Sequence, residues 1–175
     1  MPTRSESLWL REALDRYEGP LVAYAARLTG DLEVGRDAVQ DTFMRLWTAK
    51  RAEVDDHLAQ WLYTVCRNRA LDLRAKEQRH KRAPRLVLLQ SANGHHQEPT
   101  PAAEAETRDR IAAAIDLLPL EQQEPLRLKF EHGLTYRQIA AVLEVSAATV
   151  SNRIAAALAA VRDQLSESLD PAVDL

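Results

Sequence analysis

The sequence is poor in cysteine, aromatic residues, glycine and long apolar runs, and each scarcity excludes a class of structure. A single cysteine, Cys66, allows no internal disulfide, which is typical of proteins in a reducing compartment such as the cytoplasm. No apolar run approaches the ~20 residues that a membrane-spanning helix needs, so no membrane insertion is expected. The polar N-terminus does not resemble a signal peptide. Aromatic residues at 5% disfavour a β-sandwich or barrel, and abundant Ala, Leu, Arg and Glu predict an all-α protein.

Charge is distributed unevenly along the chain. The whole sequence carries a net charge of −3 from 23 basic and 26 acidic groups. Residues 67–82 nevertheless contain seven Arg or Lys against two acidic side chains, a local charge of +5. Such a cationic strip on an acidic protein indicates a polyanionic partner that is bound at one place.

Apolar spacing and turn residues predict four helices in the first part of the chain. The first two are expected over residues 5–17 and 21–29, with a break at Gly19 and Pro20 because proline cannot continue a helix. Gly30 is expected to end the second helix, and Asp31 is a favourable N-cap for a third that reaches about residue 50.

The third helix has two contrasting faces. Its apolar side is expected to pack inward and consists of Val39, Phe43, Leu46 and Trp47. Its other side carries Asp37, Gln40, Asp41 and Arg45. From the residues alone, a charged helix face of this kind is most often simply solvated surface.

The fourth helix is expected to begin near His57, after a short acidic loop at residues 52–56. One arc of its helical wheel is apolar and holds Leu58, Trp61, Leu62, Val65, Cys66 and Leu73. Arg67 and Arg74 lie opposite, so the first half is expected to pack and the second half to present cations. Trp61 and Cys66 are interpreted as packed side chains, not as a stacking platform and a reactive thiol.

Residues 83–103 predict a flexible linker between two small helical domains, 1–82 and 104–175. The segment contains prolines and an Asn-Gly pair, and it has little periodicity. His95 and His96 within it lack Cys or carboxylate neighbours at ligand spacing, so a polar linker is the favoured interpretation. No metal or other cofactor is predicted.

The second domain begins with two predicted helices. The first covers residues 104–118 and ends at Pro119, with Ile111, Ala114, Ile115 and Leu118 on its apolar face. The second covers residues 121–131, with Leu126, Leu128 and Phe130 as its apolar side chains. Pro125 lies inside it, so a late start or a kink is expected there.

Residues 133–154 predict a helix-turn-helix. Thr135 and Gln138 match a capping box that opens a helix over residues 136–143. Residues 144–146 form the turn, and Ser146 is expected to cap a longer helix. Glu144 stands where a left-handed glycine is usual, at a cost of about 1 kcal/mol. The apolar line of the longer helix is Val150, Ile154, Leu158, Val161 and Leu165.

Three segments resemble bacterial RNA polymerase sigma factors of the sigma-70 family: DAVQDTFMRLW at residues 37–47, WLYTVCRNRALDLR at 61–74 and GLTYRQIAAVLEVSAATVSNRI at 133–154. Their order is similar to that of the extracytoplasmic-function (ECF) subfamily, which has only sigma region 2 and sigma region 4. The resemblance implies region 2 at residues 1–82 and region 4 at residues 104–175. It implies a factor that binds core polymerase and directs promoter recognition, DNA opening and transcription initiation.

The resemblance also implies partners and contact residues. The polymerase β′ clamp helices would bind Asp37, Gln40, Asp41 and Arg45, and the β flap would be a second contact. The −10 promoter element would be bound by Trp61, Arg67, Asn68, Arg69, Arg74, Lys76 and Arg79, with Asn68 facing an extruded base. The −35 element would be bound by Thr135, Tyr136, Arg137, Ala148, Thr149, Ser151, Asn152 and Arg153. An anti-sigma protein is a further candidate partner.

Two features depart from the family pattern. The recognition segment at residues 146–160 carries only one cation, Arg153, so the second domain alone is expected to bind DNA weakly and to depend on the holoenzyme. The loop that usually helps to grip the extruded base is the acidic segment 52–56, which lacks an aromatic side chain.

Two other classes of function compete with this one, a stand-alone regulator and an enzyme. A stand-alone helix-turn-helix regulator would bind duplex DNA as a dimer without polymerase, and the second domain alone would permit it. The cationic strip and the helices before it disfavour this alternative. An enzyme is not expected, because the sequence offers no phosphate-binding loop, no zinc-ligand spacing and no nucleophile with an evident base.

Overall fold

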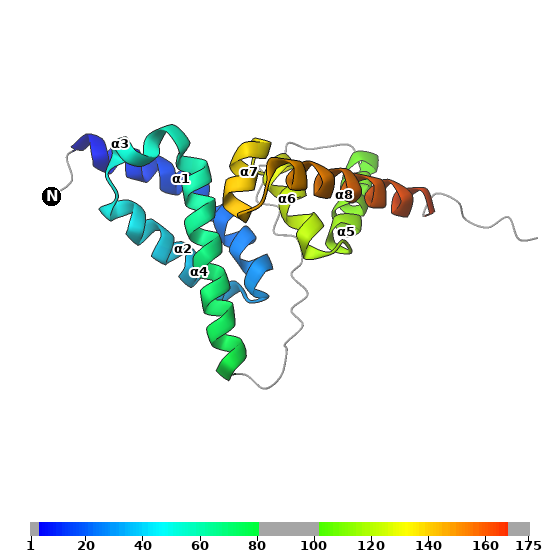
Figure 1. Ribbon diagram of the computed structural model, residues 1–175, viewed down its shortest axis with the longest axis horizontal. Coiled ribbons are helices and arrows are strands. Elements are labelled where there is room, and N and C mark those ends of the chain that lie inside the picture. Colours follow the sequence, from blue (N-terminus) through cyan, green and yellow to red (C-terminus); the bar gives the residue numbers. More distant parts are fainter. Residues whose placement is uncertain (1–3, 81–101, 168–175) are drawn as a thin grey trace, which may run out of the picture. The chain divides into compact units, whose positions relative to one another are not determined.

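The computed structural model describes residues 4–80 and 102–167, which form helices and short turns and include no strand (Figure 1). This confirms the predicted all-α class. The chain divides into two compact units, Met1–Gly94 (unit 1) and His95–Leu175 (unit 2). Most of the predicted linker, including its His pair, and the two cations at positions 81 and 82 lie outside the described residues.

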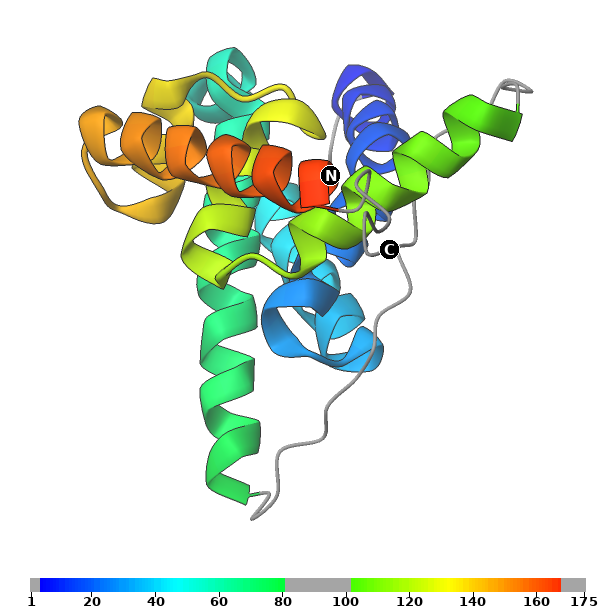
Figure 2. The same cartoon turned by 90° about the vertical axis from the view of Figure 1, so that its right-hand side faces the viewer.

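Unit 1 is built from three long helices that pack on one another. These are α1 (Arg4–Thr29), α2 (Leu32–Thr48) and α4 (Leu58–His80). The last turns of α4 project beyond α1 and α2 in both views (Figures 1 and 2). The core contains Leu21, Ala25, Leu46, Leu62, Tyr63, Cys66 and Ala70. The rings of Tyr24 and Tyr63 meet edge to face, with centroids 5.2 Å apart.

Gly35 lets α1 and α2 approach closely. A Cβ atom at this position would lie 2.7 Å from the backbone nitrogen of Ala26, closer than any side chain tolerates. The turn between the two helices follows the sequence prediction. Gly30 adopts a left-handed φ of 75°, and the Asp31 side chain accepts hydrogen bonds from the backbone amides of Glu33 and Val34.

The predicted break at Gly19 and Pro20 is wrong, because α1 runs through both residues. Pro20 removes one backbone donor and crowds the preceding turn, at a cost of about 3 kcal/mol or more in a helix interior. The residues that follow it in α1, including Leu21, Ala25 and Leu28, are almost fully buried. Burying a leucine side chain contributes roughly 1.5–3 kcal/mol. Packing of the second half of α1 therefore outweighs the local penalty.

The predicted acidic loop at residues 52–56 is also wrong. The segment folds as a short helix, α3 (Arg51–Val54), followed by a 3-10 turn, η1 (Asp55–His57). Val54, the last residue of α3, is buried. Asp55 accepts hydrogen bonds from Trp9 Nε1 at 2.8 Å and from Arg51 Nε at 3.0 Å, and the Arg51 guanidinium lies over the Trp9 ring. Long-range contacts that local sequence does not reveal hold the segment to α1.

Unit 2 consists of α5 (Ala102–Asp116), α6 (Leu120–Phe130), α7 (Tyr136–Leu143) and α8 (Ala147–Glu167). Figure 2 shows α8, coloured orange to red, lying across the other helices of this unit, and α8 contacts α5, α6 and α7. The core contains Leu118, Leu126, Leu128, Leu134, Ile139, Val142, Val150, Ile154 and Ala157. The buried Arg127 pairs with Asp116 at 2.6 Å and also with Glu131.

Some details of the predicted helix faces in unit 2 are wrong. Phe130 and Leu158, both expected in the core, are 62% and 48% exposed, and Ala157 is buried beside Leu158. Ile111 is also more exposed than its predicted apolar face implies. The helix that contains Pro125 does not start late, since α6 begins at Leu120 and Pro125 itself is fully buried.

The helix-turn-helix is confirmed. The capping box of Thr135 and Gln138 opens α7, and Glu144 adopts the left-handed conformation with φ 57°. The Ser146 hydroxyl accepts a hydrogen bond from the Thr149 amide at 3.0 Å, and α7 and α8 meet at 102°. No single helix of residues 4–80 and 102–167 is long and apolar enough to cross a membrane; the bent pair of α7 and α8 passes that test by length and composition alone.

Candidate functional site

The polar face of α2 is a continuous exposed surface. Asp37, Gln40 and Arg45 are exposed and Asp41 is half-buried, as their spacing on the helix requires. The opposite side of α2 forms core, where the buried Thr42 hydroxyl donates to the Ala38 carbonyl at 2.7 Å. The structure therefore brings together the four side chains that the sequence assigned to this face.

Sequence reasoning missed two large apolar side chains on the same surface. Met44 is 64% exposed and Trp47 is 58% exposed, although the apolar spacing of the helix predicts Trp47 in the core. On a helical wheel Trp47 lies about 80° from Asp37 and about 100° from the buried Leu46, so it stands at the boundary of the two faces. Exposed Met and Trp are typical of protein-binding surfaces. Beside Trp47, a cavity of about 420 Å³ lies among α1, α2 and α3, with Trp9, Leu46 and Arg51 in its lining.

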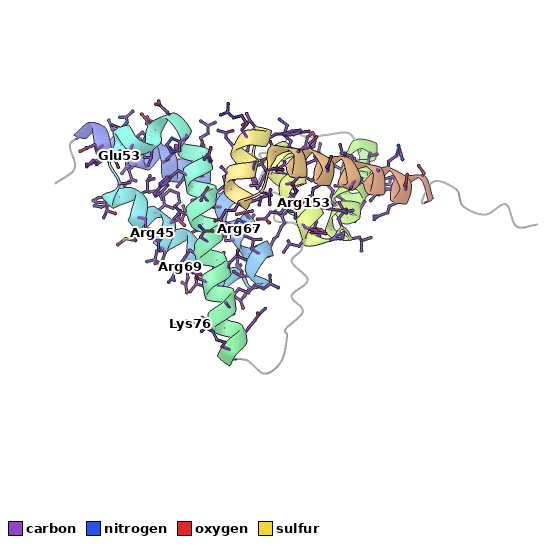
Figure 3. All side chains as sticks on the ribbon, in the orientation of Figure 1. Arg45, Glu53, Arg67, Arg69, Lys76 and Arg153 are labelled. Carbon is purple, nitrogen blue, oxygen red and sulfur yellow. The ribbon has the colours of Figure 1, made fainter. Side chains whose placement is uncertain are left out.

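The cationic helix α4 holds its charges in several different ways. Asn68, Lys76 and Arg79 are exposed, whereas Trp61, Arg67, Arg69 and Arg74 are half-buried. Figure 3 shows Arg67, Arg69 and Lys76 along α4 and Arg45 on the neighbouring α2. Arg69 pairs with Asp41 of α2. Arg74 Nη1 donates to the Leu28 carbonyl at 3.1 Å, and Arg79 Nε donates to the Ala75 carbonyl of its own helix at 3.1 Å.

These contacts give the predicted DNA-binding cations unequal roles. The Arg74 hydrogen bond satisfies one of the carbonyls that the last turn of α1 leaves without a helical partner. Arg74 is therefore also a structural residue of unit 1. The Asp41–Arg69 pair joins two side chains that the sequence assigned to different partners, one to polymerase and one to DNA.

The buried thiol of Cys66 is unsuited to chemistry. Burial raises its pKa to about 12, and a hydrogen bond with Thr42 only partly opposes this effect. Because the thiolate is the reactive form, the thiol is inert at neutral pH. The prediction of a buried apolar group is confirmed.

On α8 the predicted recognition residues form an exposed surface. Ala148, Ser151 and Asn152 are exposed, and Thr149 is half-buried beside the Ser146 cap. Arg153 Nη2 lies 3.6 Å from Glu121 Oε2 on α6, so the cation among the predicted recognition residues of this helix faces an acidic side chain. At the start of α7, Thr135 and Arg137 are exposed, and Lys129 lies over the ring of the exposed Tyr136.

The fold and these surfaces define a helical DNA-binding protein with a helix-turn-helix in one unit and a cationic helix in the other. Residues 13–80 match the family described as "Sigma-70 region 2", and residues 108–161 match "Sigma-70, region 4". The ECF RNA polymerase sigma factor SigL of Mycobacterium tuberculosis is 32% identical over 169 residues, which cover 93% of this chain and 92% of SigL.

Solved structures agree with this. CnrH, in complex with the cytosolic domain of CnrY, is 26% identical with a TM-score of 0.56, covering 90% of this chain and 88% of CnrH. The sigma factor RpoE, in complex with the anti-sigma factor NepR from Bartonella quintana, shares the fold. It is 24% identical with a TM-score of 0.63, covering 89% of this chain and 96% of RpoE.

The chain therefore belongs to the sigma-70 family, and within it to the ECF RNA polymerase sigma factors. Its function is that of a sigma factor, which binds core RNA polymerase and directs promoter recognition and transcription initiation. This supports the sigma-factor interpretation over a stand-alone helix-turn-helix regulator. The family consists of transcription initiation factors, with which the absence of an enzymatic role is consistent.

Proposed function

We propose that α2 of unit 1 is the main docking surface for core polymerase. The β′ clamp helices would contact Asp37, Gln40, Asp41 and Arg45, as the family resemblance implies. The exposed Met44 and Trp47 extend this surface and supply the apolar contacts that most often dominate binding energy. The joint exposure of these polar and apolar side chains on one helix face carries the proposal.

For the −10 element, we propose that α4 holds the separated non-template strand. Asn68 is exposed and free to face an extruded base, while Arg67, Arg69, Lys76 and Arg79 hold the phosphate backbone. Arg74 of α4 contributes positive charge while its guanidinium donates to the Leu28 carbonyl at the end of α1. Trp61 is half-buried, so only part of its side chain is accessible to a base.

Unit 2 is proposed to place α8 in the major groove at the −35 element. Ala148, Thr149, Ser151 and Asn152 would face the bases, with Asn152 suited to an adenine edge. Thr135, Tyr136 and Arg137 would approach phosphates at the start of α7, and Arg153 would contribute from α8. Since Glu121 lies close to Arg153, the recognition surface of α8 has little positive charge of its own for DNA. Binding at −35 is therefore expected to depend on the holoenzyme, with the β flap holding unit 2.

The domain limits 1–82 and 104–175, joined by the linker 83–103, complete the proposal. A stretched linker of 21 residues spans about 70 Å, which matches two turns of duplex DNA. Polymerase would provide the scaffold for that path. The chain would act in the cytoplasm, where polymerase is, and would catalyse no reaction itself. An anti-sigma protein is proposed as a further partner, because RpoE is solved with NepR and CnrH with part of CnrY.

Transcription with purified bacterial core polymerase and a promoter library tests this function directly. We expect the chain to bind core polymerase and to select a set of start sites that core alone does not use. Failure to bind core, or binding of a palindromic duplex without polymerase, would overturn the proposal.

A variant tests the polymerase face. Trp47→Ala is expected to weaken core binding about tenfold, or ~1.4 kcal/mol, as loss of an interface hot spot does. Leu8→Ala is the matched control, because Leu8 is a similarly exposed apolar side chain on α1. Titration of labelled core polymerase measures both. Equal affinities for the two variants would remove Trp47 from the interface.

A further inference from the structure

The ion pair between Asp41 and Arg69 connects two helices of unit 1. Asp41 is on α2 and Arg69 is on α4, 28 positions further along the chain, and Arg69 Nε donates to Asp41 Oδ2. Other ion pairs of this unit, such as Arg36 with Glu33 and Lys50 with Glu53, join side chains three positions apart. The pair between Asp41 and Arg69 thus links two surfaces and not two neighbours.

Both partners remain accessible to larger molecules. The Arg69 side chain is 34% exposed and the Asp41 side chain is 43% exposed. A guanidinium binds carboxylate and phosphate oxygens with the same geometry, so Asp41 and a DNA phosphate compete for Arg69. In the free chain Asp41 neutralises Arg69, which then adds little to the charge that α4 presents to DNA.

We propose that Asp41 holds Arg69 away from DNA until polymerase engages Asp41. This inference rests on the proposed function, in which α2 binds polymerase and α4 binds the separated strand. When a donor group of polymerase takes the Asp41 carboxylate, Arg69 is released and can bind a phosphate. Coupling between two binding events is reciprocal, so a strand that takes Arg69 makes Asp41 available to polymerase. The pair thereby favours DNA binding by the holoenzyme over DNA binding by the free chain.

The expected size of the coupling follows from the exposure of the pair. Partly exposed ion pairs are weak, so breaking this one should change the affinity for DNA by about two- to fivefold. Releasing one cation should also make the plot of the logarithm of the single-strand binding constant against the logarithm of salt concentration steeper by about 0.7.

A double-mutant cycle on the full chain tests the inference without polymerase. The probe is a single-stranded oligonucleotide of mixed sequence, titrated at several salt concentrations. Asp41→Asn is expected to bind it two- to fivefold more tightly than the wild type, with the steeper slope. In the Arg69→Gln background the same Asp41→Asn change should give no gain, because no cation is left to release.

Asp56→Asn is the charge-matched control. Asp56 is an exposed carboxylate of η1, 13 positions before Arg69, so its removal raises the general potential of unit 1 without removing a neighbour of Arg69. We expect its effect to be the same in the wild-type and the Arg69→Gln backgrounds, unlike that of Asp41→Asn. An Asp41→Asn gain that persists in the Arg69→Gln background would show general electrostatics alone and would overturn the inference.

A second arm measures core polymerase binding. Arg69→Gln should strengthen it two- to fivefold by leaving Asp41 unpaired, and an unchanged or weaker affinity would overturn the coupling. If the wild-type chain did not bind core polymerase at all, the proposed function would be overturned. If the chain directed initiation but the effects of Asp41→Asn and Arg69→Gln were additive, only this inference would be overturned.

Discussion

At the scale of single residues, the turn of the helix-turn-helix contains a conformation that its side chain disfavours. Glu144 is the only non-glycine residue with a positive φ in residues 4–80 and 102–167. Left-handed backbone costs an ordinary residue roughly 1 kcal/mol relative to glycine. We expect Glu144→Gly to raise the free energy of unfolding by about 0.5–1 kcal/mol, since the added chain entropy of glycine offsets part of the gain. Glu144→Ala removes the same side chain but keeps the strain, so it should give no gain in urea unfolding.

A second single-residue prediction concerns acid stability. Hydrogen bonds from Arg51 and Trp9 lower the pKa of Asp55 from its ordinary value of 3.8. A carboxylate with a lowered pKa in the folded state contributes stability above pH 3.8 and loses it as pH falls through the folded-state value. The stability difference between wild type and Asp55→Asn should therefore be largest near neutral pH and should shrink below about pH 4.

Urea unfolding at several pH values measures this difference. Asp56→Asn is the charge-matched control, because Asp56 is the exposed neighbour in the same 3-10 turn. If the difference between wild type and Asp55→Asn did not change with pH, the Asp55 carboxylate would not be the group that anchors the segment.

At the scale of helices, close packing of α1 on α2 depends on a glycine. Gly35→Ala would place a Cβ atom 2.7 Å from Ala26 N and 2.9 Å from Ala26 Cα, and backbone atoms cannot rotate away. We expect the variant to lose about 1–3 kcal/mol of stability, as overpacked cores do. Gly19→Ala is the opposite control. A Cβ atom at Gly19 would have no neighbour within 4 Å beyond the adjoining backbone of α1. The variant should therefore gain up to about 1 kcal/mol of stability from helix propensity. Equal thermal stability of the two variants would contradict this account.

Some features of the helices could be predicted from the sequence and others could not. Helix ends marked by side-chain chemistry, such as Asp31 and the capping box of Thr135 with Gln138, were predictable because the contacts span three residues or fewer. The continuity of α1 through Pro20 was not, since it depends on burial against α2 and α4. The helical wheel placed Asp37 and Gln40 correctly but not Trp47, which lies at the edge between two faces.

The contacts of the cations were also beyond sequence reasoning. The strip was evident from composition, and the part of it that the structure describes, residues 67–80, does lie on one helix, α4. Arg69 and Arg74, however, contact residues of α2 and α1 that lie 28 and 46 positions away. Only the tertiary fold shows that these two cations, which we propose bind DNA, also make contacts within the protein itself.

At the scale of the whole molecule, we expect stability and DNA binding to be separable along α4. Arg79 is exposed, and within the described part of the chain it donates to the Ala75 carbonyl of its own helix, whereas Arg74 donates to the Leu28 carbonyl at the end of α1. Arg79→Ala should reduce open-complex formation and flatten the salt slope of single-strand binding by about 0.7, with unfolding unchanged within roughly 0.5 kcal/mol. Arg74→Ala should do the same and also destabilise unit 1 by about 1 kcal/mol, since the carbonyl loses its partner. Core binding should stay intact in Arg79→Ala, and its loss would mean that polymerase and DNA share the surface of α4. Open-complex yield, urea unfolding and core titration of the two variants together decide the point.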